Sequence, residues 1–244
     1  MELLLIFCLL SFSIANGVIM ECNFVASPPT QPFPAVYECQ GSFNFSVDPN
    51  KLETIEGIHE NRKGNFDVQS LSIRNDEKLE QIPKTVGSFC PNLKSFMWVD
   101  SNLRLLSGDD FRHLARLKFL SLAGNKIESL ESDLFMHTPR LEVIRLGRNL
   151  IAHMERELLE DLGDLKSIDF TDNSCINGKA ETQEEMQQLK SLFSGCPALR
   201  LSPRELCDLR KEIKAKLENI DRKIAEAGDE TCDDFDVTRY LVTD

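Results

Sequence analysis

The hydrophobic positions of this chain recur at a fixed interval over its central part. Segments that open with Leu93, Leu117, Leu141 and Leu165 start 24 residues apart. An earlier segment from Val68 follows the same order after a one-residue insertion. Within each segment the first, fourth, sixth, eleventh and fourteenth places are apolar. A repeat of this length predicts a solenoid, whose units bury a core only by stacking on one another.

Asparagine fills the ninth place of the last three units, at Asn125, Asn149 and Asn173, while Asp76 and Ser101 stand there in the first two. An amide side chain donates and accepts hydrogen bonds at once, so stacked copies can satisfy backbone groups that become buried where the chain turns. We therefore predict that the three asparagines form a structural ladder. The ladder should be weaker at the amino-terminal end.

The pattern LxxLxLxxNxLxxL of these units resembles the leucine-rich repeat. The resemblance implies an α/β solenoid, a short horseshoe with about five repeats over residues 68–174 and short strands lining its concave side. Phe111, Phe135 and Leu159 recur at one place of the unit and resemble the phenylalanine column on the convex side of this family. Terminal caps are expected to cover the two open ends of the core.

The start of the chain has the pattern of a signal peptide. An apolar stretch runs from Leu3 to Ile14 and is followed by Ala15 and Gly17, at the spacing of small residues that precedes cleavage. The stretch is shorter than the roughly 20 apolar residues of a membrane span. We expect a signal peptide over residues 1–17 and a secreted mature chain without a membrane span, with a membrane anchor as the alternative.

The cysteines suit an exported chain, which can keep disulfides. Cys8 is one of 8 cysteines and falls within the signal peptide, so an odd number remains. The expected caps cover residues 18–67 and 175–201. The resemblance implies one disulfide in each cap, pairing Cys22 with Cys39 and Cys175 with Cys196, although spacing alone does not determine connectivity. Three further cysteines have no assigned partner: Cys90, Cys207 and Cys232.

Residues 202–228 are predicted to form an amphipathic helix. Ser202 and Glu205 make a capping box at its start, and Gly228 ends it. Its apolar stripe consists of Leu206, Leu209, Ile213, Leu217, Ile220 and Ile224. The helix either folds back on its own repeats or packs on a partner's helix in a homo- or hetero-dimer, with an interchain disulfide through Cys207 or Cys232. Residues 229–244 are predicted to be an acidic, flexible tail.

Charge and motifs restrict the function. A net charge of −12 argues against nucleic acid or an anionic membrane as the main partner. His113 and His137 lie one repeat apart and mark copied positions, and the chain has no glycine-rich phosphate loop, nucleophile elbow or zinc motif. We therefore predict that the protein is not an enzyme and has no metal or cofactor site.

Binding through the concave side is the remaining hypothesis. The residues between the core leucines include a predicted exposed apolar patch of Met97, Val99, Phe119 and Val143, flanked by Arg74, Arg145 and Arg148. The expected partner is a protein or a microbial surface. The order of signal, repeats, cysteines and helical tail resembles the secreted leucine-rich-repeat immune proteins of insects, which implies a role in innate immunity; a structural or adhesive matrix protein is the alternative. Asn44 in the tripeptide NFS is a predicted glycosylation site.

Overall fold

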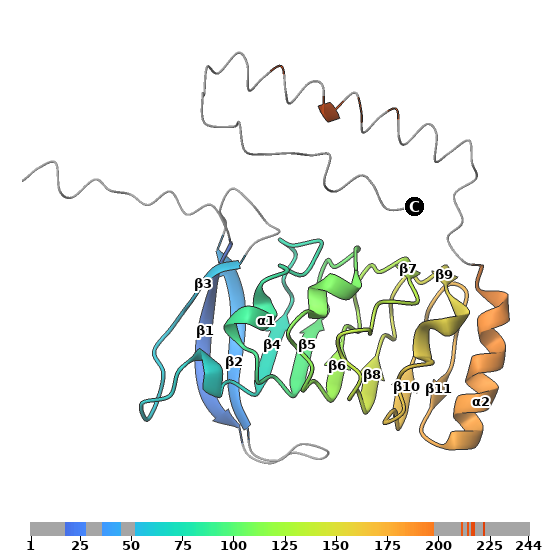
Figure 1. Cartoon of the computed structure of the whole chain (residues 1–244), viewed down its shortest axis with the longest axis horizontal. Helices are drawn as coiled ribbons and strands as arrows, with labels where there is room; N and C mark the ends of the chain where they lie inside the picture. The colour runs from blue at the N-terminus through green and yellow to red at the C-terminus, as the bar shows by residue number, and fades with distance from the viewer. Residues whose placement is uncertain are drawn as a thin grey trace, which may run out of the picture. The chain divides into compact units, whose positions relative to one another are not determined.

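The computed structural model describes residues 18–27, 36–44 and 52–197, and the single positions Lys211, Lys214, Lys216, Leu217 and Arg222. The chain divides into two compact units, residues 1–199 and residues 200–244. Figure 1 shows the first unit as a row of short strands with turns and short helices on one side. The expected signal peptide, residues 1–17, and the expected acidic tail, residues 229–244, lie outside the described residues.

The repeats form a continuous sheet. Its nine strands in the described residues follow the order β11-β10-β8-β6-β5-β4-β2-β1-β3. Their bounds are β1 (Val18–Ser27), β2 (Val36–Asn44), β3 (Leu52–Glu56), β4 (Ser70–Arg74), β5 (Ser95–Val99), β6 (Phe119–Ser121), β8 (Val143–Arg145), β10 (Ser167–Asp169) and β11 (Lys179–Ala180). The strands β4, β5, β6, β8 and β10 are parallel, and Phe119 pairs with Ser95 on one side and Val143 on the other. The register of the sheet is therefore the repeat itself, and the predicted α/β solenoid is confirmed.

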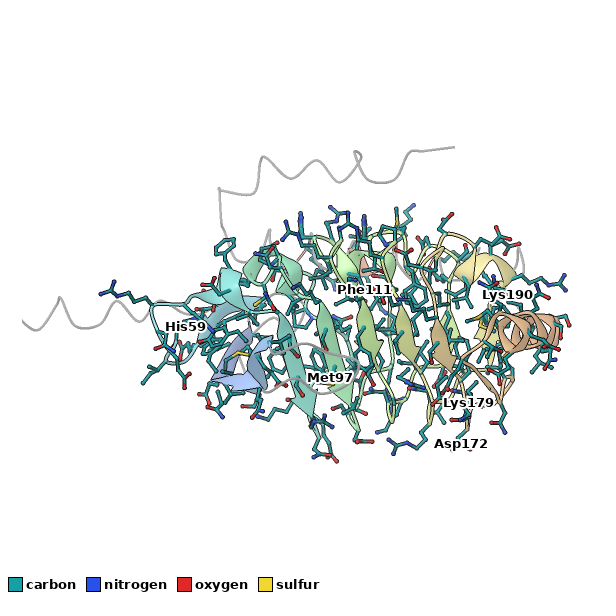
Figure 2. The ribbon with its side chains drawn as sticks, turned by 90° about the horizontal axis from the view of Figure 1, so that it is seen from below. His59, Met97, Phe111, Asp172, Lys179 and Lys190 are labelled. Carbon is teal, nitrogen blue, oxygen red and sulfur yellow. A yellow bond between two sulfur atoms is a disulfide. The ribbon has the colours of Figure 1, made fainter. Side chains whose placement is uncertain are left out.

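Alternation along each strand separates the core from the opposite face of the sheet. In β5, Phe96 and Trp98 are fully buried, whereas Met97 between them is half-buried on the other side. Phe111 continues the core into the layer of turns, with its ring centroid 6.4 Å from those of both Phe96 and Phe135. Figure 2 shows Phe111 among the turns and Met97 on the opposite side of the strands.

The return segments on the convex side are short. They contain the helix α1 (Val86–Phe89), the 3-10 turns η1 (Asn65–Asp67), η2 (Gly108–Phe111) and η3 (Arg156–Leu159), and the paired strands β7 (Ser129–Leu130) and β9 (His153–Met154). At η2 the Ser107 N–H donates to Asp110 Oδ2 over 2.8 Å, which satisfies a carboxylate that is only 4% exposed. Burial raises the pKa of Asp110 above its ordinary value, and this hydrogen bond acts in the opposite direction.

The asparagines at the ninth place join neighbouring coils. Asn149 Oδ1 accepts from the Ile127 N–H over 3.2 Å, and its Nδ2 donates to the carbonyls of Leu122 (2.9 Å) and Leu146 (3.0 Å). Equivalent hydrogen bonds are made at the other two positions, Asn125 and Asn173. Each amide thus satisfies groups of its own coil and of the coil before it, as the repeat pattern predicts.

Aromatic side chains and a disulfide cover each end of the core. At the amino-terminal end, β1 and β2 form an antiparallel hairpin joined by a disulfide between Cys22 and Cys39, and the ring of Phe43 stacks on Trp98 at 5.0 Å. β2 then pairs in parallel with β4, which connects this hairpin to the first repeat. The sequence predicts a cap here but not its hairpin, because the cap does not share the repeat period.

The carboxy-terminal end is covered by a helix. A disulfide joins Cys175 to Cys196 around α2 (Gln183–Leu192) and the 3-10 turn η4 (Phe193–Gly195). Thr182 and Glu185 form a capping box at the start of α2, where two backbone N–H groups lower the pKa of the Glu185 carboxyl. Phe193 packs edge-on against Phe170 of the last repeat, with 6.0 Å between ring centroids.

The second unit is described at a few positions of the predicted amphipathic helix. Lys211, Lys214, Lys216, Leu217 and Arg222 are all helical, and Leu217 is the least exposed of them. The four basic side chains are exposed and Leu217 is half-buried, and the apolar stripe as a whole stays a prediction. No helix among the described residues is long and apolar enough to cross a membrane.

Candidate functional site

The face of the sheet opposite the core is here called the concave face. Because neighbouring strands are in register, equivalent residues of successive repeats lie side by side on it. Its three columns are Ser70, Ser95, Phe119, Val143 and Ser167; Ser72, Met97, Ser121, Arg145 and Asp169; and Arg74, Val99, Ala123, Gly147 and Thr171. The strands fix the spacing of these side chains, so the face is rigid before any partner binds.

Three half-buried apolar side chains gather at the middle of the concave face, and we call Met97, Phe119 and Val143 the apolar patch. Phe119 lies directly opposite Val143, and Met97 lies opposite Ser121 in the next column. Ser95 and Ser121 are only 4% and 7% exposed, so these small side chains lie lower than the apolar groups beside them. The larger side chains therefore stand above a floor of serines, where a partner can reach them.

The structure corrects the expected place of Val99 in this patch. Val99 belongs to the third column but is only 7% exposed. The chain turns directly after it at Asp100, whose φ of 52° is left-handed, so Val99 lies at the base of a turn. Its expected role as an exposed contact is wrong.

A charged group borders the apolar patch at β8 and β10. Arg145 Nη1 lies 3.9 Å from Asp169 Oδ2, and the Arg145 side chain is 34% exposed. The other oxygen of Asp169 accepts from the Thr171 N–H (2.9 Å) and hydroxyl (2.7 Å), which holds the carboxylate in place. The guanidinium keeps donors directed toward solvent, because a single long contact uses few of its five N–H groups. Arg74 is exposed at the end of β4, opposite Val99.

The structure also corrects the position of Arg148. The alternate place after Arg145 is taken by Gly147, and Arg148 occupies the left-handed turn beyond it with a φ of 56°. Its Nη2 lies 2.9 Å from Asp100 Oδ1, two coils away, and this ion pair passes over Gly124. Arg148 therefore lies at the edge of the concave face, where it links turns, and does not flank the apolar patch from within a strand.

Of the histidines in the repeats, His137 lies beside a charged pair of the preceding coil. His137 Nε2 lies 3.9 Å from Asp109 Oδ1, and the same oxygen accepts from Arg112 Nη2 over 2.7 Å. The Arg112 guanidinium lowers the pKa of Asp109 below its ordinary value. Within the described residues no group of three or more histidine, cysteine, aspartate or glutamate side chains is placed to hold a metal ion.

Two further features lie away from the concave face. The thiol of Cys90 is free and fully buried in the core, and burial raises its pKa to about 12, so it is a poor nucleophile near neutral pH. A hollow of about 400 Å³ lies between α2 and the segment that leads into the last repeat, and its lining includes Leu159, Leu162, Leu165 and Met186.

Several predicted sites lie outside the described part of the chain. Asn44 is the last residue of β2, but its side chain is not among those described. Cys207 and Cys232 also lie outside it. The glycosylation and interchain disulfide assigned to these three residues remain predictions.

Comparison with known proteins identifies the repeats. A family model described as leucine rich repeat matches residues 67–127 and 120–175. No curated protein matches the chain.

Three solved structures match part of this chain. A chain of the Toll–Spatzle complex, a hub of Drosophila development and innate immunity, is 22% identical over 53% of this chain and 18% of its own, with a TM-score of 0.43. The ectodomain of the receptor kinase SOBIR1 from Arabidopsis thaliana is 16% identical over 62% of this chain and 78% of its own, with a TM-score of 0.38. A leucine-rich-repeat protein of Leptospira interrogans is 21% identical over 54% of this chain and 29% of its own, with a TM-score of 0.36.

Proposed function

We propose that this chain, whose repeats match the leucine rich repeat family model, is a secreted, non-enzymatic module that binds a protein or microbial-surface ligand through its concave face. The observation that carries this proposal is the apolar patch of Met97, Phe119 and Val143 beside the Arg145 guanidinium. Exposed apolar groups clustered on a rigid face mark interaction sites, and arginine is enriched where binding energy concentrates. The face therefore suits a partner that presents an apolar side chain next to an acidic group.

The disulfides support an extracellular location. Cystine bridges persist in oxidising compartments and are rare in the cytosol, and this chain carries one at each end of its repeats. Secretion directed by the predicted signal peptide, residues 1–17, accounts for the extracellular location and for the persistence of the two disulfides. The immune role rests on the resemblance in the order of parts to the insect leucine-rich-repeat immune proteins. A rise in transcript after microbial challenge would support it, whereas constant deposition in extracellular matrix would favour the structural alternative.

Alanine substitution at the apolar patch tests the binding site. The double variant Met97→Ala with Phe119→Ala should lose the extracellular proteins or microbial material that the wild-type chain captures. Leu105→Ala is the matched control, because Leu105 is 63% exposed and belongs to a return segment, not to the concave columns. Bound material is compared by quantitative mass spectrometry after each variant is shown to fold by circular dichroism.

The outcomes separate the sites. Equal capture by the double variant and the wild type would contradict binding at the apolar patch. Loss in both the double variant and Leu105→Ala would show that the effect is not specific to the concave face.

The predicted helix extends the proposal to assembly. With Cys22, Cys39, Cys175 and Cys196 paired and Cys90 buried, an interchain bond falls to Cys207 or Cys232. Non-reducing and reducing gels of the secreted protein, with Cys207→Ser and Cys232→Ser alongside, test it. A species of twice the mass that vanishes with one substitution supports a disulfide-linked dimer through the tail. A monomer in every lane supports a helix that folds back on its own repeats.

A further inference from the structure

The return segments that lead into β6, β8 and β10 present a charged surface at one edge of the repeats. Successive coils place equivalent residues in rows 24 positions apart, as the neighbouring rings of Phe111 and Phe135 show. We call three of these rows the bipolar edge. They are Arg112, Met136 and Glu160; His113, His137 and Asp161; and Arg116, Arg140 and Asp164. All these residues except the half-buried His137 are exposed.

Charge changes sign along the bipolar edge. The first coil contributes Arg112 and Arg116, and the third contributes Glu160, Asp161 and Asp164. Among the described residues none of these three carboxylates lies within 4.0 Å of a basic side chain. One end of the surface is therefore basic and the other is acidic, on a chain whose net charge is −12.

The two arginines at the basic end, Arg112 and Arg116, each have a partner in their own molecule that leaves further N–H donors available. Arg116 Nη1 donates to Asn92 Oδ1, a neutral partner, over 2.9 Å. Arg112 Nη2 donates to Asp109 over 2.7 Å while its side chain remains 56% exposed. Each guanidinium carries five N–H donors in a fixed arrangement, so both can meet a further carboxylate.

An apolar side chain lies between the two charged ends. Met136, in the central coil, is 58% exposed and contacts its own molecule near Gly108. Protein interfaces commonly place an apolar group at the centre and charged groups at the rim. The row of Arg112, Met136 and Glu160 has this arrangement.

A surface that runs from basic to acidic is complementary to itself when turned end over end. A two-fold axis through the central coil lays the basic coil of one copy over the acidic coil of the other, and the same pairing recurs on the far side of the axis. We propose that the bipolar edge binds a second copy of this chain in an antiparallel, two-fold dimer. Arg112 and Arg116 of each copy then face Glu160 and Asp164 of the other, and the exposed Met136 and Arg140 of the central coil each lie near their own equivalents at the axis.

The dimer is independent of the concave face and of the tail cysteines. It leaves the apolar patch of both copies open, so each dimer offers two binding faces and gains avidity for a ligand that repeats on a surface. Because it rests mainly on exposed charge pairs, each of which contributes little, we expect weak association that salt weakens further.

Charge reversal in two complementary variants tests the proposal. The first variant is Arg112→Glu with Arg116→Glu, and the second is Glu160→Arg with Asp164→Arg. Sedimentation velocity of the full chain at physiological ionic strength should show a wild-type dimer and a dissociation constant raised about tenfold or more in each variant alone. An equimolar mixture of the two variants should restore the dimer, because both contacts then join opposite charges.

The restored heterodimer separates loss of this interface from loss of folding. Recovery on mixing shows that both variants are folded, and Met136→Glu should weaken the wild-type dimer by changing a side chain that is itself 58% exposed. A wild-type monomer at every concentration would overturn the proposal, as would a dimer that the reversals leave unchanged. A dimer that a non-reducing gel shows to be covalent would assign assembly to the tail. A monomer whose basic coil binds an anionic polysaccharide such as heparin would assign that coil to another partner.

Discussion

The coils closed by asparagine and the two amino-terminal coils make the same turn with different side chains. Asn149 and its equivalents each bond to their own coil and to the coil before it. In the amino-terminal coils, Asp76 Oδ1 accepts from Lys78 N–H and Leu79 N–H of its own coil. Of these two ninth-place side chains, Ser101 is the one that joins the two coils, since its hydroxyl accepts from Asp76 N–H over 3.0 Å and donates to the Val99 carbonyl over 2.9 Å.

The amino-terminal coils are held together by other means. Trp98 stacks on Phe43, and the hairpin closed by Cys22 and Cys39 continues the sheet beyond β4. Lys78 Nζ also donates to the Phe43 carbonyl, which fastens the first repeat to the cap. Neighbouring coils are therefore coupled by buried amides in the carboxy-terminal half and by aromatic packing and the cap in the amino-terminal half. Removing one ninth-place side chain should cost more where the amide is the main link.

The largest effect is expected from Asn149→Ala. The side chain is 5% exposed, and its loss leaves the Ile127 N–H buried without this partner and removes one hydrogen bond from each of the Leu122 and Leu146 carbonyls. The Leu122 carbonyl keeps its bond from Asn125 Nδ2. An unsatisfied buried group costs about 1–3 kcal/mol and the two weakened carbonyls add to it, so we expect the free energy of unfolding to fall by about 3 kcal/mol. Urea unfolding followed by circular dichroism measures it. Asn173→Ala is the matched control and should cost less, because Asn173 is half-buried and water can replace its bonds.

The next effect is expected where the two halves meet. Gly124 has a left-handed φ of 70°, and a Cβ there would lie 2.2 Å from Asp100 Oδ1, the atom that pairs with Arg148. Gly124→Ala should lower the free energy of unfolding by about 2 kcal/mol, from the backbone conformation and from displacement of this carboxylate. In the background Asp100→Ala the same substitution should cost about half as much, because only the backbone term remains. Equal costs in both backgrounds would show that Asp100 does not oppose the new Cβ.

Ser101→Ala tests the ninth place in the amino-terminal coils. The hydroxyl makes two hydrogen bonds at a position that is 8% exposed, and without it the Trp98–Phe43 stack still holds the second repeat against the cap. We expect a loss of about 1 kcal/mol, clearly smaller than that of Asn149→Ala. Unfolding free energies measured in the same urea series decide between them, and a Ser101 effect as large as that of Asn149 would show that the two turns are equally dependent on the ninth place.

The repeat period predicts the structural features that recur in every repeat, and it does not predict those that differ from one repeat to the next. The 24-residue spacing gives the strands, their register and the column that contains Phe119 and Val143, because each follows from alternation on stacked coils. The repeat period does not give the positions of Arg148 and Val99, since these depend on where a strand ends and a left-handed turn begins. A glycine in the sequence usually indicates a left-handed turn. At this place of the repeat Gly124 is the one glycine among the described residues, whereas Asp100 and Arg148 adopt the same left-handed conformation although they carry side chains.

The bipolar edge shows a second limit of the same kind. Arg112, Arg116, Glu160 and Asp164 are ordinary surface residues in sequence, and the apolar pattern assigns them no role. Only the stacking of coils brings them into rows and reveals that charge reverses along each row. Reading the repeats in columns for charge, and not for leucine alone, is the signal that would have found this surface.

The smallest effect is expected at a charge ladder on the strand side of the same coils. Glu142 lies between Lys118 and Lys166, with Lys166 Nζ 2.6 Å from Glu142 Oε2, and these lysines hold the pKa of Glu142 below its ordinary value of 4.5. A carboxyl whose pKa is lowered in the folded state stabilises it above the unfolded pKa, and loses this contribution as pH falls through the folded pKa. Glu142→Gln should therefore cost about 0.5 kcal/mol at neutral pH, as expected for largely exposed pairs.

That cost should disappear in acid. The wild type and Glu142→Gln should unfold with nearly equal free energies once the pH is well below 4.5, and the difference at neutral pH should also shrink in 1 M salt, where the screening length is about 3 Å. Glu131→Gln, at an exposed position of the same repeat region, is the control and should change little at any pH. A Glu142 effect that persists unchanged in acid would mean that the side chain acts by packing, in the way the buried asparagines act by hydrogen bonding, and not through its charge.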